Sequence, residues 1–132
     1  MLKTFAPSDL PDNCELTLRL SPTQANTNAG GNIFGGWLMS QVDIAASIIA
    51  YERARMPVVT RAVNSFQFIK PVFVGDLVSC YGHIIHEGHS SMTIHELVYT
   101  QRGNTPDLHI KVAEAELVFV AINHNHKPTP YR

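Results

Sequence analysis

The chain has 132 residues, 45% of them hydrophobic, and a formal net charge of −1 at pH 7. A chain of this length can bury roughly two-thirds of its unfolded surface, so we expect a single domain over residues 1–132. The near-neutral charge excludes the basic field typical of nucleic-acid-binding proteins, and no apolar run is long enough to cross a bilayer. We therefore expect no nucleic-acid partner and no membrane insertion.

The amino-terminal segment gives no sign of export. The first ten residues lack the long apolar core of a secretory signal. The two cysteines, Cys14 and Cys80, are expected to be free thiols, because disulfides are rare inside cells. Together these features predict a soluble cytoplasmic protein. Prolines and polar residues in 1–13 and 123–132 predict loose arms at both ends.

The first regular element expected is a strand from Glu15 to Leu20, where polar and apolar residues alternate. A glycine-rich turn follows from Asn28 to Gly36. The next segment, from Trp37 to Arg53, is apolar nearly all the way round, which is typical of a helix buried on most of its surface. With a rise of 1.5 Å per residue, this helix would be roughly 25 Å long.

One carboxylate, Asp43, interrupts the predicted helix. Aspartate is a mediocre helix former, and a buried carboxylate is unfavourable unless it is paired or neutralised. Because ionisable groups in such surroundings are enriched at functional sites, Asp43 is a candidate catalytic group. The alternative is that Asp43 faces solvent or bonds to a nearby hydroxyl or amide.

Four long strands are expected after the helix, because the sequence becomes rich in β-branched and aromatic residues. Short turns separate them, so consecutive strands are expected to be antiparallel neighbours. They cover Val58 to Ile69, Leu77 to His86, Ser90 to Gln101 and Leu108 to Ile122. An α+β fold with five antiparallel strands wrapped around one long helix is the economical arrangement. The last strand is apolar on both faces, which indicates a partner subunit.

Two motifs resemble those of the hotdog fold, specifically of the bacterial YciA-type acyl-CoA thioesterases. One is Thr-Asn-Ala-Gly-Gly-Asn-Ile-Phe-Gly-Gly-Trp-Leu-Met-Ser-Gln-Val-Asp at residues 27–43, and the other is Phe-x-x-x-Lys-Pro-Val-x-x-Gly-Asp-x-Val at residues 66–78. One departure is Gly31-Asn32, where close relatives often have Gly-Asp. The resemblance covers roughly residues 16–122. It implies hydrolysis of acyl-CoA thioesters without a cofactor, in homodimers that assemble further, commonly as hexamers.

The resemblance also implies roles for four residues. Asp43 matches the catalytic acid, Asn28 matches an amide from the facing protomer, and the backbone amides of Gly35 and Gly36 match those that polarise the thioester carbonyl. The first N–H groups of a helix lack partners and carry a partial positive charge, which suits that task. Asp43 lies about 12 Å further along the same helix, so we expect a site shared across a dimer. Whether Asp43 acts as a general base or as a nucleophile stays open.

Contacts with the coenzyme are expected from strand edges and basic side chains. The candidates are Thr60, Ser90 and Ser91 for the pantetheine arm, and Arg61, Lys70, Arg102 and Lys111 for the phosphates. Each basic residue taken alone fits a solvated surface charge equally well. Helix residues Met39 and Val42 could line an acyl slot, although such residues are more often plain core. A metal site is not expected at His86, Glu87, His89 and His95, because this spacing falls on a turn rather than on one helix face.

Two other functions compete with hydrolysis. A dehydratase or hydratase of the same fold usually places a catalytic histidine near the start of the helix, but here the first histidine is His83. A non-catalytic acyl-CoA sensor usually carries a DNA-binding segment, for which residues 1–13 are too short and not basic. Release of free thiol from a panel of acyl-CoAs would separate the three functions.

Overall fold

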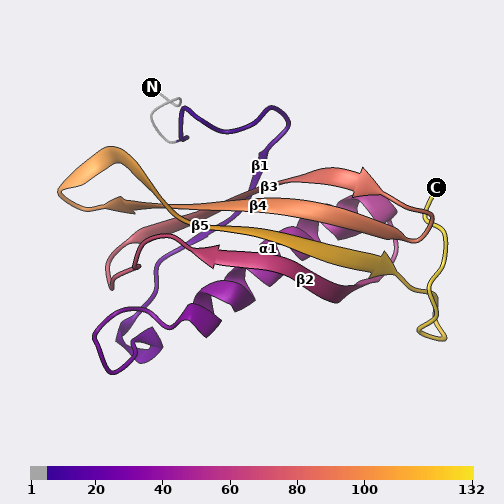
Figure 1. Ribbon diagram of the computed structural model, residues 1–132, viewed down its shortest axis with the longest axis horizontal. Helices are drawn as coiled ribbons and strands as arrows, with labels where there is room; N and C mark the ends of the chain where they lie inside the picture. The colour runs from indigo at the N-terminus through magenta and orange to yellow at the C-terminus, as the bar shows by residue number, and fades with distance from the viewer. Residues whose placement is uncertain (1–5) are drawn as a thin grey trace.

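The computed structural model describes residues 6–132 and consists of one long helix packed on a five-stranded antiparallel sheet (Figure 1). The α+β fold class predicted from the sequence is confirmed. A short 3₁₀ turn at Gln24–Asn26 precedes the helix. The helix and strands are β1 Glu15–Leu20, α1 Gly35–Ala54, β2 Val58–Phe68, β3 Leu77–Glu87, β4 Ser91–Arg102 and β5 Thr105–Ala121. Among these residues, no helix is both long and apolar enough to span a membrane.

The strand order in the sheet is β1-β3-β4-β5-β2. Neighbours β3, β4 and β5 follow one another in sequence, as predicted. The expectation that β2 lies beside β3 is wrong, since β2 pairs with β5 at the opposite side of the sheet. The connecting segment 69–76 spans that distance and is held by a hydrogen bond of 2.9 Å from the Ile33 amide to the Val72 carbonyl. Strand β2 is therefore a sheet edge.

The hairpin between β4 and β5 is tighter than predicted. The sequence indicates a turn over residues 102–107, but Arg102 and Thr105 already pair across the two strands. Two residues, Gly103 and Asn104, are enough to reverse the chain, and both belong to types common in hairpin turns. Strand β5 thus begins earlier than expected, and the hairpin projects beyond the rest of the sheet in Figure 1.

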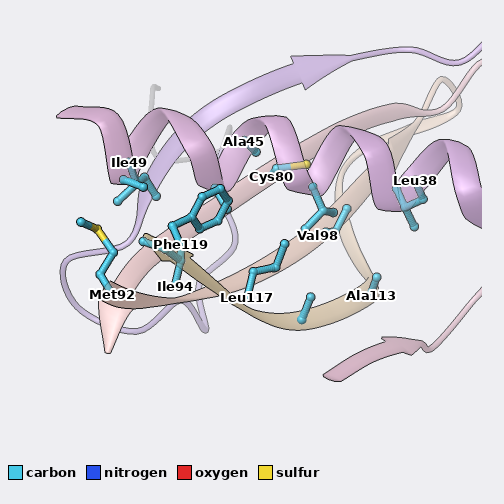
Figure 2. Close-up of a cluster of buried hydrophobic side chains, with 14 of the residues drawn as sticks. Leu38, Ala45, Ile49, Cys80, Met92, Ile94, Val98, Ala113, Leu117 and Phe119 are labelled. Carbon is cyan, nitrogen blue, oxygen red and sulfur yellow. The ribbon is translucent and has the colours of Figure 1, made fainter. Parts of the chain in front are cut away.

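Small residues on α1 let the helix lie close to the sheet. Ala45, Ala46 and Ala50 are fully buried and face larger side chains from the strands. Figure 2 shows this arrangement, with Phe119, Leu117 and Ile94 standing between sheet and helix. Burial of each large apolar side chain contributes about 1.5–3 kcal/mol to the free energy of folding, so this layer is the main source of stability.

Both segments predicted to be loose arms contact the sheet. Residues 1–5 of the first arm lie outside the residues that the structure describes. At the amino end, Leu10 and Cys14 pack against a small cluster formed by Tyr81, Leu97 and Tyr99. At the carboxyl end, Tyr131 is buried, and its hydroxyl lies 2.9 Å from the carbonyl oxygen of Ser91. The end of the segment predicted to be loose is thus packed onto the turn between β3 and β4.

Candidate functional site

The loop before α1 is organised by the side chain of Asn28. Its Oδ1 accepts hydrogen bonds from the backbone amides of Gly30, at 2.9 Å, and Asn32, at 3.2 Å. Because Oδ1 faces two donors, the amide orientation is determined, and Nδ2 is left as a donor. Among residues 6–132, no protein acceptor for Nδ2 is found. Asn28 therefore fixes the loop with one end of its amide and offers a hydrogen-bond donor with the other.

Helix α1 begins without a side-chain cap. Its N-cap residue is Phe34, whose side chain accepts no hydrogen bond from the first turn. Asn32, a residue type that often caps helices, lies earlier in the loop. In the described residues, the amides of Gly35 and Gly36 have no protein acceptor. They form an exposed pair of donors at the positive end of the helix dipole.

The two glycines meet different surroundings. A Cβ added to Gly35 would lie 3.1 Å from the Phe68 ring, whereas one added to Gly36 would have no heavy atom within 4 Å. Gly35 is thus required by close contact with the edge strand β2. Gly36 faces open space, which leaves its amide accessible to a ligand.

A cavity of about 320 Å³ lies beside the helix start. Its wall is largely apolar, with polar groups at Asn28, Asn32 and Lys70. A mostly apolar pocket with a few polar groups is the usual form of a small-molecule site. The remaining lining residues are Ile33, Phe34, Gly35, Leu38, Phe68, Ile69, Pro71 and Val72. The structure thus brings three of the predicted site residues, Asn28, Gly35 and Lys70, to one cavity.

Asp43 lies outside this cavity, near the middle of α1. Its side chain is half-buried, and its Oδ1 accepts a hydrogen bond of 2.6 Å from the Thr60 hydroxyl on β2. A hydroxyl donor orients the carboxylate and leaves Oδ2 free for another partner. The sequence predicted a coenzyme contact for Thr60 and gave a bond from Asp43 to a nearby hydroxyl as an alternative; that bond is present, and Thr60 is its donor. A side chain of the neighbouring strand is a natural partner for Asp43, since a strand packed on a helix directs alternate side chains toward it.

The basic candidates separate into two groups. Arg102 pairs with Asp76, with Nε 3.1 Å from Oδ1, and Lys111 Nζ lies 2.6 Å from Glu114 Oε1. These two side chains are therefore occupied within the protomer. Arg61 and Lys70 are exposed, and within residues 6–132 neither has an ion-pair partner, so both could meet phosphates. Arg61 lines a second groove of about 350 Å³ together with Thr60 and the tail residue His126.

Ser90 lies in the turn between β3 and β4, and Ser91 is the first residue of β4. The Ser90 carbonyl accepts the amide of Ala121 at 2.8 Å, and the Ser91 carbonyl accepts that of Gly88 at 2.8 Å. Both serines thus stabilise the turn through their backbone. Their hydroxyls are not brought to the cavity beside Asn28, and contact of these residues with a ligand stays a prediction.

Two of the histidines, His83 and His95, are held in a network on the sheet. His95 Nε2 lies 2.7 Å from Glu114 Oε2, and its Nδ1 lies 3.0 Å from Nε2 of His83, on the sheet face away from α1. Burial and the neighbouring His95 lower the pKa of His83. In the described part of the chain, no group of three or more His, Cys, Asp or Glu is arranged to hold a metal ion.

Comparison with known proteins gives consistent matches. The Thioesterase superfamily matches residues 30–106. The chain is 42% identical to the acyl-CoA thioester hydrolase YciA of Salmonella typhimurium over 88% of this chain and 89% of that protein. It is also similar to the hexameric thioesterase y2039 of Yersinia pestis, with 44% identity, a TM-score of 0.87 and coverage of 93% and 98%. A hexameric hotdog fold thioesterase of Campylobacter jejuni matches with 34% identity, a TM-score of 0.84 and coverage of 89% and 90%.

Proposed function

The chain belongs to the Thioesterase superfamily, and we propose that it hydrolyses acyl-CoA thioesters at a site divided between two protomers. It has the hotdog fold, and its close relatives are named as acyl-CoA thioester hydrolases. The observation that carries the proposed site is the Asp43 carboxylate, which Thr60 holds beside the exposed edge strand β2. This position at the edge of the sheet supports the proposal that a second protomer reaches the carboxylate.

The geometry of the edge strand supports a shared site. Strand β2 is a free edge, with Val59 44% and Val63 45% exposed, and such edges pair readily with another strand. Antiparallel pairing of two β2 strands about a two-fold axis places the Phe68 end of one strand at the Val58 end of the other. The cavity beside Gly35 of one protomer then adjoins Asp43 of its partner. Within one protomer the two groups are separated by about 12 Å of helix.

The chemistry then divides between the two protomers. The free amides of Gly35 and Gly36 donate to the thioester carbonyl oxygen and stabilise the charge that develops there. The Asn28 amide donates from the same loop and orients the thioester or the attacking water. The partner's Asp43 either removes a proton from water or attacks the carbonyl carbon itself. In both cases a C–O bond forms, the C–S bond breaks, and the thiolate of CoA leaves and takes up a proton. When water attacks, the free acid forms directly; when Asp43 attacks, water then hydrolyses the resulting anhydride, which releases the acid and restores the carboxylate.

The coenzyme would lie along the boundary between the protomers. The proposed phosphate contacts are Lys70, which lines the cavity, and Arg61, which lies near the Val58 end of β2. Further candidates for contact with the coenzyme are Thr60, Ser90 and Ser91. Assembly of three such dimers into a hexamer is proposed from the hexameric relatives. The proposed reaction needs water and no cofactor. The absence of a cofactor and a cytoplasmic location both stay predictions.

Replacing the carboxylate tests the proposed site. Asp43→Asn keeps the shape of the side chain and a hydrogen-bonding partner for Thr60 but removes the base and nucleophile. We expect kcat for thiol release from acyl-CoA to fall by about 10²–10⁴-fold, with an unchanged melting temperature. Glu52→Asn, on the exposed side of the same helix, is the matched control and should retain full activity. An Asp43→Asn enzyme with near wild-type turnover would remove Asp43 from the mechanism.

A further inference from the structure

Strand β4 carries a carboxylic acid into the core between the sheet and α1. Glu96 is fully buried, although it alternates with the apolar residues Ile94 and Val98 on the helix-facing side of the strand. Neither of its carboxyl oxygens has a hydrogen-bond partner in the described residues. A buried polar group without a partner is strongly unfavourable, and more so when it is charged. Glu96 takes no part in the proposed reaction.

The space that Glu96 fills is made by a glycine. Gly82 pairs with Glu96 across β3 and β4. A Cβ at Gly82 would collide with Glu96 Oε2 and would also lie 2.8 Å from Ile49 Cδ1 on α1. The carboxyl group therefore lies over Gly82, against the helix. It occupies the layer in which α1 and the sheet are in contact.

The groups around Glu96 supply no positive charge. Strand β5 presents Ala115 opposite Glu96, and α1 presents Ile49. The titratable neighbours are two thiols, Cys80 on β3 and Cys14 before β1, and both have a raised pKa because of burial and the nearby Glu96. The Cys80 pKa is raised to about 12, so this thiol stays neutral below that pH. Nothing in this surrounding stabilises a charged carboxylate.

Burial alone raises the pKa of Glu96 to about 9, from an ordinary value of 4.5. An acid whose pKa is higher in the folded than in the unfolded state makes its full contribution to stability at pH values below its unfolded-state pKa. As the pH rises from the unfolded-state pKa to the folded-state pKa, this contribution is lost, and the folding constant falls by up to tenfold per pH unit. The window therefore runs from about pH 5 to about pH 9.

We propose that Glu96 is a proton-dependent latch between α1 and the sheet, closed while the carboxyl group is neutral and opened when it ionises. Opening releases the helix that carries Gly35, Gly36 and Asp43. We therefore expect activity to fall at alkaline pH as the core opens. The latch rests on the packing of Glu96, so it does not depend on which reaction the site performs.

Trp37, the one tryptophan of the chain, reports on the latch. It lies in the first turn of α1 and packs against the core. Its fluorescence, followed during urea unfolding at a series of pH values, gives the folding constant of the wild-type protein and of Glu96→Gln. Glutamine keeps the shape but cannot ionise. We expect the wild-type folding constant to fall relative to that of Glu96→Gln by up to tenfold per pH unit between about pH 5 and pH 9.

Two further variants keep the test decisive. Glu96→Leu covers the case in which a buried amide itself prevents folding. Because leucine cannot ionise either, the folding constant of Glu96→Leu should depend on pH in the same way as that of Glu96→Gln. Glu52→Gln, on the exposed side of α1, should follow the wild-type profile. If the wild-type protein and the Glu96 variants lose stability in parallel across this range, the latch is wrong. The same conclusion follows if the folding constant of Glu96→Gln or Glu96→Leu falls with pH as steeply as that of the wild-type protein.

Discussion

Asn28 performs two tasks with one side-chain amide. Its carbonyl oxygen closes the loop through the backbone amides of Gly30 and Asn32, and its Nδ2 group remains as a donor beside the cavity. The two tasks can be separated because aspartate keeps the accepting oxygen and lacks the donor. The residue thus links the local fold of the loop to the chemistry at the helix start.

We predict that Asn28→Asp folds normally and loses at least about 10²-fold in kcat, because it removes one donor to a developing oxyanion and adds a negative charge beside it. Asn28→Ala should lose activity to a similar extent and should also lower the free energy of unfolding by about 1 kcal/mol, since two loop amides lose their acceptor. Steady-state thiol release and urea unfolding measure the two effects. Full activity in Asn28→Asp would show that the donor plays no part in catalysis.

The sequence points to Asp43 as a candidate catalytic group, and the resemblance to thioesterases points to Asn28, but neither indicates that Thr60 is the hydrogen-bond partner of Asp43. A carboxylate inside an apolar helix is conspicuous because of what its burial costs. A threonine in a β-branched strand is not, and its bond to Asp43 depends on how β2 lies against α1. Glu96 is not among the residues predicted from the sequence, although the pattern of its strand indicates that its side chain points inward. It occupies an inward place in a strand whose alternation, Met92, Ile94, Val98, was already visible.

At the scale of elements, the start of α1 is shaped to leave its amides free. Phe34 provides no side-chain cap, and Gly36 has no neighbouring side chain within reach of an added Cβ. Both features weaken the helix end, since a cap typically contributes about 1 kcal/mol and alanine is a better helix former than glycine. The helix end is therefore not arranged for stability, which is consistent with the proposed oxyanion site.

We predict that Gly36→Ala is as stable as the wild-type protein or more stable by up to about 1 kcal/mol, yet loses at least tenfold in kcat/KM. The added methyl group would stand in the open space through which the substrate reaches the amide. Ser40→Ala, one turn further along α1 and also exposed, is the matched control and should retain activity. A Gly36→Ala enzyme with unchanged kcat/KM would argue against substrate approach at this point.

The sequence allowed the element types to be predicted, but not the position of β2. Periodicity and turn residues report which face of a strand is buried, and they carry no information about which edge a strand joins. That choice depends on segment 69–76, which is bound to the loop before α1 through Ile33 and Val72. The consequence is functional, because β2 as an edge strand places Thr60 and Asp43 at the boundary of the protomer.

At the scale of the whole molecule, the apolar edge of β2 indicates assembly. Val59, Val63 and Phe68 are all more than two-fifths exposed along one strand. A long apolar edge strand is a hazard for aggregation unless it is covered. A second copy of β2 would cover it and would also complete the site.

We predict that Val63→Glu converts the assembly to monomers and abolishes thioesterase activity, because a two-fold axis brings like charges together across the paired strands. Analytical ultracentrifugation and thiol release measure the two outcomes. Leu108→Glu changes an apolar residue on the β4–β5 hairpin that is 55% exposed, against 45% for Val63, and should affect neither. Retained activity in a demonstrably monomeric Val63→Glu protein would place the whole site within one chain.

Mixing two inactive variants tests the shared site most directly. Asp43→Asn and Asn28→Asp protomers are unfolded, combined in equal amounts and refolded, and thiol release from acyl-CoA is measured. A mixed dimer contains one site with both native residues, so random pairing should restore about a quarter of wild-type activity. If mixed dimers form, as verified by differential mass labelling, and activity stays at the level of the separate variants, Asp43 and Asn28 act within one chain and the shared site is wrong.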